Sequence, residues 1–140
     1  MNIVVLGAGY VGCVSAACFA RLGHRVIAVD VEPSKVDALR GGHSPILEPD
    51  LDELIGEVVA SGRLTATVEA DLAIAAADAV MICVGTPSQR NGSLDTRAMS
   101  RVLETIVRAT SERQHKLPDA IRSTIIAPVL RQLVAQCTPN

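Results

Sequence analysis

The amino-acid sequence predicts an α/β domain built on an open, doubly wound parallel sheet, and two observations carry that prediction. Short β-branched apolar runs alternate along the chain with helical patterns and turn residues. The runs are apolar throughout, which is typical of strands buried on both faces of a parallel sheet. Because crossovers between parallel strands are right-handed, the doubly wound arrangement is the favoured topology. The 140 residues suffice for one domain, so we interpret residues 1–140 as a single unit.

The first elements follow from apolar runs and their stop signals. Residues 2–6 and 25–29 are apolar runs rich in β-branched residues, and both are predicted strands. Residues 10–22 predict a helix of small residues that ends at Gly23. Pro33 suits the first turn of a short helix that ends at a pair of glycines.

The middle of the chain repeats the alternation. Residues 51–59 show the apolar spacing of an amphipathic helix. Asp50 is predicted to cap that helix and Glu53 to close a capping box. Residues 64–67 predict a short strand, followed by an alanine-rich helix that extends to Ala77.

The last elements are a strand over residues 79–84, a loop over 85–94, and a long helix capped by Asp95. A further strand is predicted over residues 120–124 and a final helix over 129–135. The long helix carries apolar residues at helical spacing, namely Met99, Val102, Leu103, Ile106 and Val107.

Charge and composition exclude several classes of function. Thirteen Lys and Arg face fifteen Asp and Glu, for a net charge of −2, which offers no electrostatic footprint for nucleic acid or an anionic membrane. Tyr10 and Phe19 are the aromatic residues, too few for a base-stacking platform. No apolar run approaches a membrane span, and the N-terminus lacks the basic region of a signal peptide. We therefore expect a cytoplasmic protein that binds neither nucleic acid nor membrane.

The four cysteines predict no metal site. Cys13, Cys18, Cys83 and Cys137 form no C-x-x-C pair, and no His stands at zinc-ligand spacing from them. The first three lie in apolar runs, where cysteine behaves as a small buried hydrophobe. We expect inert, reduced thiols.

The segment after the first predicted strand matches the G-x-G-x-x-G fingerprint of dinucleotide-binding, Rossmann-like domains. Gly7 permits the tight turn, Gly9 leaves room for a pyrophosphate, and Gly12 lets helix and strand pack closely. Asp30 follows Gly12 by 18 residues, where an acid binds the adenosine ribose hydroxyls and repels a 2′-phosphate. The fingerprint predicts NAD in preference to NADP; the alternative is a glycine-rich turn without a ligand, in which Asp30 merely caps.

Further strings narrow the family. They are residues 44–49 (Ser-Pro-Ile-Leu-Glu-Pro), 84–88 (Val-Gly-Thr-Pro-Ser), 91–95 (Asn-Gly-Ser-Leu-Asp) and 122–124 (Arg-Ser-Thr). Together with residues 7–12 they resemble the N-terminal NAD-binding domain of the UDP-glucose/GDP-mannose dehydrogenase family. The first and third strings resemble the GDP-mannose branch more than the UDP-glucose branch.

The resemblance implies roles for individual residues. Tyr10 and Val11 would contact the pyrophosphate through their backbone N–H groups, and Asp30 and Lys35 would hold the adenosine ribose. Two of these have plainer interpretations: Lys35 as a solvated helix lysine, and Tyr10 as a packing residue. Residues 44–49 would lie near the cofactor, without an assigned role.

At the other end of the cofactor, the resemblance implies Thr86 beside the strand end and Thr124 near the nicotinamide. Thr86 has a plainer interpretation as the start of a Thr-Pro turn. After Thr124 the family continues with two apolar residues and Pro-Gly-Thr, whereas residues 125–129 read Ile-Ile-Ala-Pro-Val. The turn into the last helix is therefore expected to differ.

The resemblance implies an NAD-dependent nucleotide-sugar 6-dehydrogenase that oxidises GDP-mannose to GDP-mannuronate with two NAD, in polysaccharide biosynthesis. UDP-glucose is the alternative substrate, and a non-catalytic NAD-binding module is the alternative function. The family's Gly-Gly-x-Cys-x-Pro-Lys-Asp string does not occur in the sequence. We therefore expect no catalytic residue in this chain, an absent substrate domain that would bind the nucleotide sugar, and a monomer or weak dimer.

Overall fold

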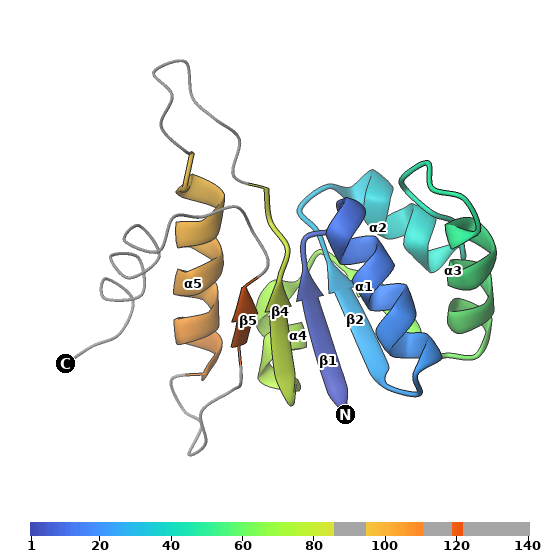
Figure 1. Ribbon diagram of the computed structural model, residues 1–140. Helices are drawn as coiled ribbons and strands as arrows, with labels where there is room; N and C mark the ends of the chain where they lie inside the picture. The colour runs from blue at the N-terminus through green and yellow to red at the C-terminus, as the bar shows by residue number, and fades with distance from the viewer. Residues whose placement is uncertain (86–94, 111–118, 122–140) are drawn as a thin grey trace.

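The computed structural model describes residues 1–85, 95–110 and 119–121, which form a parallel sheet covered by helices on both faces (Figure 1). The strands are β1 (Asn2–Leu6), β2 (Arg25–Val29), β3 (Leu64–Thr67), β4 (Ala79–Ile82) and β5 (Asp119–Ile121). The helices are α1 (Tyr10–Arg21), α2 (Pro33–Arg40), α3 (Leu51–Ala60), α4 (Ala70–Ala75) and α5 (Arg97–Thr110). The strand order is β3-β2-β1-β4-β5, and each neighbouring pair is parallel. The predicted doubly wound, Rossmann-like α/β fold is confirmed.

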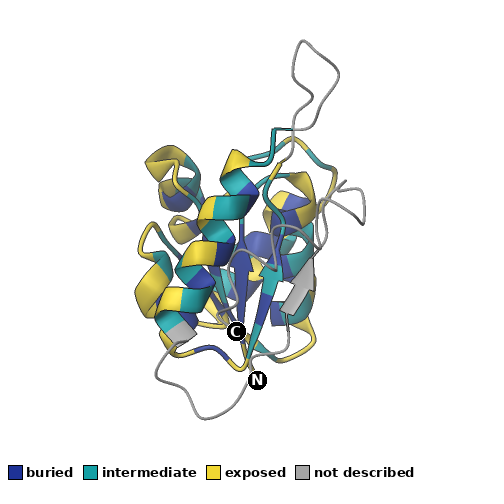
Figure 2. Ribbon diagram, turned by 90° about the vertical axis from the view of Figure 1, so that its left-hand side faces the viewer, coloured by how far each residue is buried: buried dark blue, intermediate teal, exposed yellow. Residues whose placement is uncertain are grey.

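Two apolar cores lie on opposite faces of the sheet, because successive strand residues point to opposite sides. In β1, Ile3 and Val5 belong to the core beneath α1, α2 and α3, whereas Val4 and Leu6 belong to the core beneath α4 and α5. Figure 2 shows the buried strands between exposed helix surfaces. Burial on both faces explains why the strands read as continuous apolar runs.

Several predicted boundaries match the observed ones. The strands predicted over residues 2–6, 25–29 and 64–67 have those bounds. Helix α1 ends at Arg21, one residue before the predicted end, and Gly23 follows with a φ of +99° that glycine adopts without strain.

The predicted cap of α3 is wrong. Asp50 has a φ of +62° and its side chain makes no capping hydrogen bond. In this left-handed conformation its backbone carbonyl accepts from the N–H of Leu54, and no side-chain cap forms. The neighbouring carboxylate of Asp52 instead accepts from the backbone N–H of Ser44, at 2.8 Å, which ties the preceding loop to the helix.

Two further elements are shorter than predicted. Helix α4 ends at Ala75 and not at Ala77, because the N–H groups of Ala76 and Ala77 donate to carbonyls three residues earlier, which closes the helix with tight turns. Strand β4 ends at Ile82, not at residue 84.

Helix α5 starts at Arg97, so its N-cap residue is Thr96, whose carbonyl accepts from the N–H of Ser100. The predicted cap, Asp95, lies one residue earlier and supports the helix start from there. One Asp95 carboxylate oxygen accepts from the backbone N–H of Arg97 at 3.1 Å, and the other lies 2.6 Å from the Arg97 guanidinium. These contacts lower the pKa of Asp95 to about 2. Of the predicted apolar positions, Met99, Leu103 and Ile106 are buried.

The remaining predictions lie outside the described residues. They concern the loop after residue 85, the strand end at 122–124 and the helix over 129–135. Within the described ranges, no helix is long and apolar enough to cross a membrane.

Candidate functional site: the glycine turn and the cavity beside it

The candidate site lies where the strand order reverses direction, at the carboxyl ends of β1 and β4 (Figure 1). From β1 the chain proceeds through α1 to β2 on one side, and after β3 it returns through α4 to β4 on the other side. In open α/β sheets this switch point is where ligands bind. The turn that follows β1 contains Gly7, Gly9 and the start of α1.

The protein itself requires glycine at two positions of the turn. Gly7 has a φ of +101°, and a Cβ there would lie 2.7 Å from the carbonyl oxygen of Cys83. A Cβ on Gly12 would lie 1.7 Å from the carbonyl oxygen of Gly7. Both predicted reasons are therefore confirmed: Gly7 makes the turn, and Gly12 lets α1 pack against it.

Gly9 differs, because no protein atom lies within 4 Å of a Cβ built there. Its backbone is extended, with a φ of −82°, so conformation does not demand glycine either. The first helical hydrogen bond runs from the N–H of Cys13 to the carbonyl of Gly9. Within the described residues, the N–H groups of Tyr10 and Val11 donate to no acceptor. The open space therefore lies beside unpaired donors at the positive end of the helix dipole, which suits an anion.

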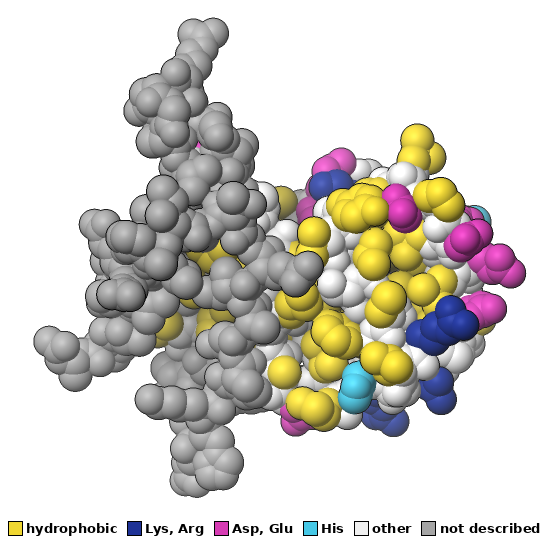
Figure 3. All heavy atoms as spheres, viewed as in Figure 1, with side chains coloured by type: hydrophobic (Ala, Val, Ile, Leu, Met, Phe, Trp, Pro, Cys, Tyr) yellow, Lys and Arg dark blue, Asp and Glu magenta, His cyan; other side chains and the backbone are white. Residues whose placement is uncertain are grey.

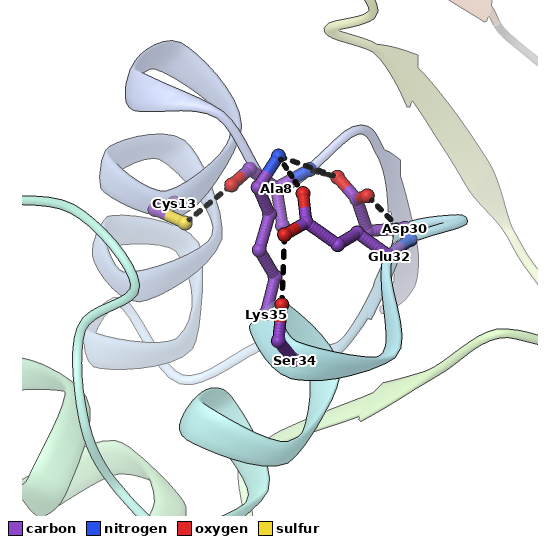
Figure 4. Close-up of polar contacts among 6 residues, drawn as sticks. All are labelled: Ala8, Cys13, Asp30, Glu32, Ser34 and Lys35. Carbon is purple, nitrogen blue, oxygen red and sulfur yellow. Dashed lines mark hydrogen bonds and ion pairs between the residues drawn. The ribbon is translucent and has the colours of Figure 1, made fainter.

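Asp30 lies directly after β2, across the turn from Gly9. Its Oδ2 accepts from the N–H of Ala8 at 2.7 Å, and its Oδ1 accepts from the N–H of Glu32 at 3.0 Å (Figure 4). The side chain is 10% exposed, and the residue lines the cavity described below. Asp30 therefore does join two backbone segments, as the plainer interpretation holds, but it also faces open space.

Lys35 reaches back from α2 to this carboxylate. Its Nζ lies 4.0 Å from Asp30 Oδ2 and 3.1 Å from Glu32 Oε2, and its side chain is 33% exposed (Figure 4). The hydrogen bond to Glu32 is the main reason that the pKa of Lys35 is raised. The ammonium is thus held between two carboxylates at the cavity rim, which argues against a freely solvated lysine.

A cavity of about 660 Å³ extends from the glycine turn along the ends of the strands. Its size is typical of sites for small molecules and cofactors. Much of its wall is apolar, with Val31 after β2, Val68 after β3 and Val102 on α5. Arg101 and Thr105 of α5 complete that side. An elongated ligand with an anionic centre and an apolar end fits this arrangement.

Tyr10 stands at the entrance to α1 with its side chain exposed. The nearby carboxylate of Glu48 raises the pKa of Tyr10. The loop over residues 44–49 therefore lies beside the start of α1. Ser44 shapes the loop, since its Oγ donates to the carbonyl of Ile46 at 2.7 Å.

The comparison with known proteins identifies the family. The family model described as "UDP-glucose/GDP-mannose dehydrogenase family, NAD binding domain" matches residues 1–137. The chain belongs to the UDP-glucose/GDP-mannose dehydrogenase family, as its NAD-binding domain. Members of this domain class bind NAD, and the open donors, the space at Gly9 and the ribose-side acid described above fit that cofactor.

Two curated relatives show the range of the family. The chain is 41% identical to a GDP-mannose 6-dehydrogenase of Pseudomonas putida over 136 residues, which is 96% of this chain and 31% of the relative. It is 53% identical to a UDP-glucose 6-dehydrogenase of Rhizobium meliloti over 90 residues, which is 64% of this chain and 21% of the relative. The chain thus spans about a third or less of the relatives' length.

Solved structures agree with this assignment. A ternary complex of GDP-mannose dehydrogenase from Pseudomonas aeruginosa superimposes with a TM-score of 0.94 at 38% identity, over 98% of this chain and 31% of the other. A UDP-glucose dehydrogenase from Pyrobaculum islandicum gives 0.90 at 40% identity, over 97% of this chain and 32% of the other.

The structure brings together most of the residues that the sequence proposes for the NAD-binding domain. Five of them lie in the glycine turn and the start of α1, and two lie beside it. The first group is Gly7, Gly9, Tyr10, Val11 and Gly12, and the second is Asp30 and Lys35. Thr86 and Thr124 lie outside the described residues.

Sequence reasoning missed Glu32 and the wall contributed by α5. Glu32 holds Lys35, and its Oε1 accepts from the Ser34 hydroxyl at 2.8 Å. The Glu-x-x-Lys spacing at a helix start was a readable signal for that pair. The contribution of Arg101 to the cavity wall could not be predicted from the sequence, because it depends on how α5 packs beside β4.

In the described part of the chain, Cys13, Cys18 and Cys83 form no disulfide. Cys13 is buried, its thiol donates to the carbonyl of Ala8 at 3.3 Å, and burial raises its pKa to about 11. The expectation of burial is wrong for Cys18, which is exposed on the outer side of α1. No cluster of three or more metal-ligating side chains occurs among the described residues.

Proposed function

We propose that this chain is the NAD-binding part of a nucleotide-sugar 6-dehydrogenase that oxidises GDP-mannose to GDP-mannuronate with two NAD. One observation carries the proposal: the open space at Gly9 adjoins unpaired N–H donors at the start of α1, with Asp30 across the same cavity. The relatives, a GDP-mannose 6-dehydrogenase and a UDP-glucose 6-dehydrogenase, indicate the reaction class.

The diphosphate, the adenosine ribose and the adenine ring of NAD are each assigned to a part of the cavity. The N–H groups of Tyr10 and Val11 bind the diphosphate beside Gly9, because the helix start offers donors and a positive dipole end. The carboxylate of Asp30 accepts hydrogen bonds from the adenosine ribose, with Lys35 at its side. The apolar wall that includes Val31, Val68 and Val102 suits the adenine ring.

Gly7 and Gly12 belong to the cofactor site because they hold this geometry, and Gly7 also lines the cavity. When bound, NAD supplies the acceptor for the substrate's hydride. Thr86 and Thr124 belong to the nicotinamide end in this proposal, on the strength of the sequence resemblance alone.

The substrate half is proposed to lie elsewhere in the protein. The family's Gly-Gly-x-Cys string does not occur in these 140 residues. The chain by itself is then expected to bind NAD without oxidising a sugar, since covalent and acid–base steps need positioned groups. We propose that a separate substrate domain binds the nucleotide sugar. We expect this chain alone to be a monomer or weak dimer. A cytoplasmic location belongs to the same proposal, because the ligands are charged and cross apolar barriers poorly.

UDP-glucose is the second candidate substrate. One specific observation favours it: the relative from Rhizobium meliloti, a UDP-glucose 6-dehydrogenase, shares 53% identity over 90 residues. The GDP-mannose relative matches at lower identity over nearly the whole chain, and residues 44–49 and 91–95 carry the strings that resemble its branch.

The test is NADH formation by the product of the complete reading frame, assayed by absorbance with GDP-mannose and with UDP-glucose. The proposal expects turnover of GDP-mannose at two NADH per sugar, with UDP-glucose much slower. Equal rates, or faster turnover of UDP-glucose, would reject the substrate assignment. NAD binding without turnover of either sugar would leave a binding module in place of an enzyme.

A further inference from the structure

The positive charge of Lys35 would favour NADP at a site that is proposed to bind NAD. Its ammonium lies 4.0 Å from Asp30 Oδ2 and lines the cavity at the ribose end. A lysine ammonium is a ready partner for phosphate. With Asp30 and Lys35 alone, the two charges sum to zero, and little repulsion would meet a dinucleotide that carries an extra 2′-phosphate.

Glu32 changes that balance. Its Oε2 lies 3.1 Å from Lys35 Nζ, closer than Asp30 does, and its Oε1 accepts from the Ser34 hydroxyl at 2.8 Å. Its own N–H donates to Asp30 Oδ1 at 3.0 Å, so backbone and side chain are both fixed (Figure 4). With Glu32 included, the group of two carboxylates and one ammonium carries a net charge of −1.

Glu32 is also the N-cap residue of α2, and its side chain makes no capping hydrogen bond. An acid that served only the helix start would be expected to accept from the first free N–H groups. Instead the carboxylate turns toward Lys35. Hydrogen bonds from Ser34 and Lys35 lower the pKa of Glu32, so it is charged at neutral pH.

The other cation of the cavity lies on a different wall. Arg101 belongs to α5, and its Nε donates to the carbonyl of Arg97 in its own helix. No ion pair links Arg101 to Asp30 or Glu32 among the described residues. The charge at the ribose end is therefore set by Asp30, Glu32 and Lys35.

We propose that Glu32 is a specificity-determining residue of the cofactor site, which occupies Lys35 and adds the negative charge that excludes a 2′-phosphorylated dinucleotide. The proposal rests on the proposed function, in that the cavity must bind NAD. The ligand class it excludes is NADP and other nucleotides with a phosphate on the adenosine ribose.

The test compares the Kd of NAD and of NADP, by calorimetry for NAD and by displacement of NAD for NADP. Glu32→Gln removes the charge at nearly constant shape, and Glu32→Asp keeps the charge. Glu57→Gln is the matched control, because it removes one exposed carboxylate from α3, a helix that contributes no residue to the cavity lining, whereas α2 contributes Lys35. Circular dichroism confirms that each variant is folded.

In Glu32→Gln the ratio of the NADP Kd to the NAD Kd is expected to fall about five- to tenfold, from one charge acting on a phosphate at close range in water. The ratio in Glu32→Asp and Glu57→Gln stays within about twofold of the wild type, since the rim charge persists in both. Raising the salt from about 0.05 M to about 0.5 M shrinks the effect of Glu32→Gln, because exposed charges are screened.

An unchanged ratio in Glu32→Gln, or a parallel change of both Kd values, would overturn the proposal, since a merely structural role moves both ligands alike. A fall of the same size in Glu57→Gln would also overturn it, because net charge alone would then explain the effect. If the wild-type chain binds neither nucleotide, the proposed function itself fails, an outcome distinct from normal NAD binding with an unchanged ratio.

Discussion

Gly9 and Gly12 show how two glycines three residues apart meet different requirements. A Cβ on Gly12 would collide with the carbonyl of Gly7, whereas a Cβ on Gly9 meets no protein atom. Gly12 therefore serves the fold. Gly9 leaves a space that the fold does not use, and that space is where a ligand is expected.

A pair of substitutions separates these requirements. Gly12→Ala is expected to lower the free energy of unfolding by about 3 kcal/mol, because the methyl group has no room against the Gly7 carbonyl. Gly9→Val is expected to lower it by only about 1 kcal/mol, because its surroundings are open and its backbone is extended, while valine is a poorer N-cap residue than glycine. Urea unfolding measures both.

The same pair has an opposite effect on the ligand. Gly9→Val is expected to abolish NAD binding in a folded protein, because the side chain occupies the place of the pyrophosphate. Retained NAD affinity in Gly9→Val would contradict binding of the pyrophosphate beside Gly9, and a stable Gly12→Ala protein would contradict the packing explanation.

Asp30 is the residue that links cofactor and fold most directly. Asp30→Ala is expected to weaken NAD binding by about 1.5–3 kcal/mol, the usual range for hydrogen bonds to a charged group. It is also expected to reduce stability, because the N–H groups of Ala8 and Glu32 lose their acceptor. Calorimetry with NAD measures the first effect, and an unchanged Kd would remove Asp30 from the site.

At the scale of elements, the strands were the most predictable part and the helix ends the least. Residues 2–6 and 25–29 are short, apolar and β-branched, and no helix of that length competes for such a pattern. The cap at Asp50 was not predictable, because a residue typical of helix starts adopted a left-handed backbone conformation that sequence preference alone does not reveal.

Helix α1 departs from the amphipathic pattern of a surface helix. Its outer side carries Val11 and Cys18 in exposed positions, and Leu22 directly after its end is exposed as well. Figure 3 shows hydrophobic side chains gathered over α1. The small residues on its inner side, such as Ala16 and Ala17, pack against the sheet. An apolar run alone therefore could not tell the buried cysteine from the exposed one.

The two cysteines of α1 are expected to differ in reactivity. Cys13 is buried, and its pKa of about 11 leaves about one thiol in a thousand ionised at pH 8. Cys18 is exposed. Alkylation of the folded chain at pH 8, followed by peptide mass spectrometry, is expected to label Cys18 well before Cys13.

Alkylation of Cys13 is expected to increase with pH. Because the pKa of Cys13 is raised, its thiolate becomes abundant in the folded protein only as the pH approaches about 11. Labelling of Cys13 in native protein should therefore rise steeply between neutral and strongly alkaline pH. Equal labelling of both residues at pH 8 would mean that the turn opens readily enough to expose the thiol.

At the scale of the whole molecule, the sheet order explains why the site lies where it does. β1 has β2 on one side and β4 on the other, and the helices that leave these strands cover opposite faces. The helices therefore diverge at the carboxyl ends of β1 and β4, and the glycine turn opens into the cavity between them.

The glycine turn and Asp30 were predictable because their chemistry depends on local spacing. The position of α5 was not, since Arg101 and Val102 are distant in sequence from the turn and reach the cavity only through tertiary packing. Glu32 is only two residues from Asp30 in the sequence, but its role in the site follows from its contact with Lys35 in the structure. Local motifs thus predict the cradle, and the fold supplies the remaining wall.

The most direct test of NAD binding at the glycine turn is a calorimetric titration of the 140-residue chain with NAD, with NADP titrated in parallel. We expect saturable binding of NAD at one site per chain and much weaker binding of NADP, because the donors of α1 are open and the ribose end carries net negative charge. Absence of binding by NAD, or binding of NADP as tight as that of NAD, would contradict this expectation.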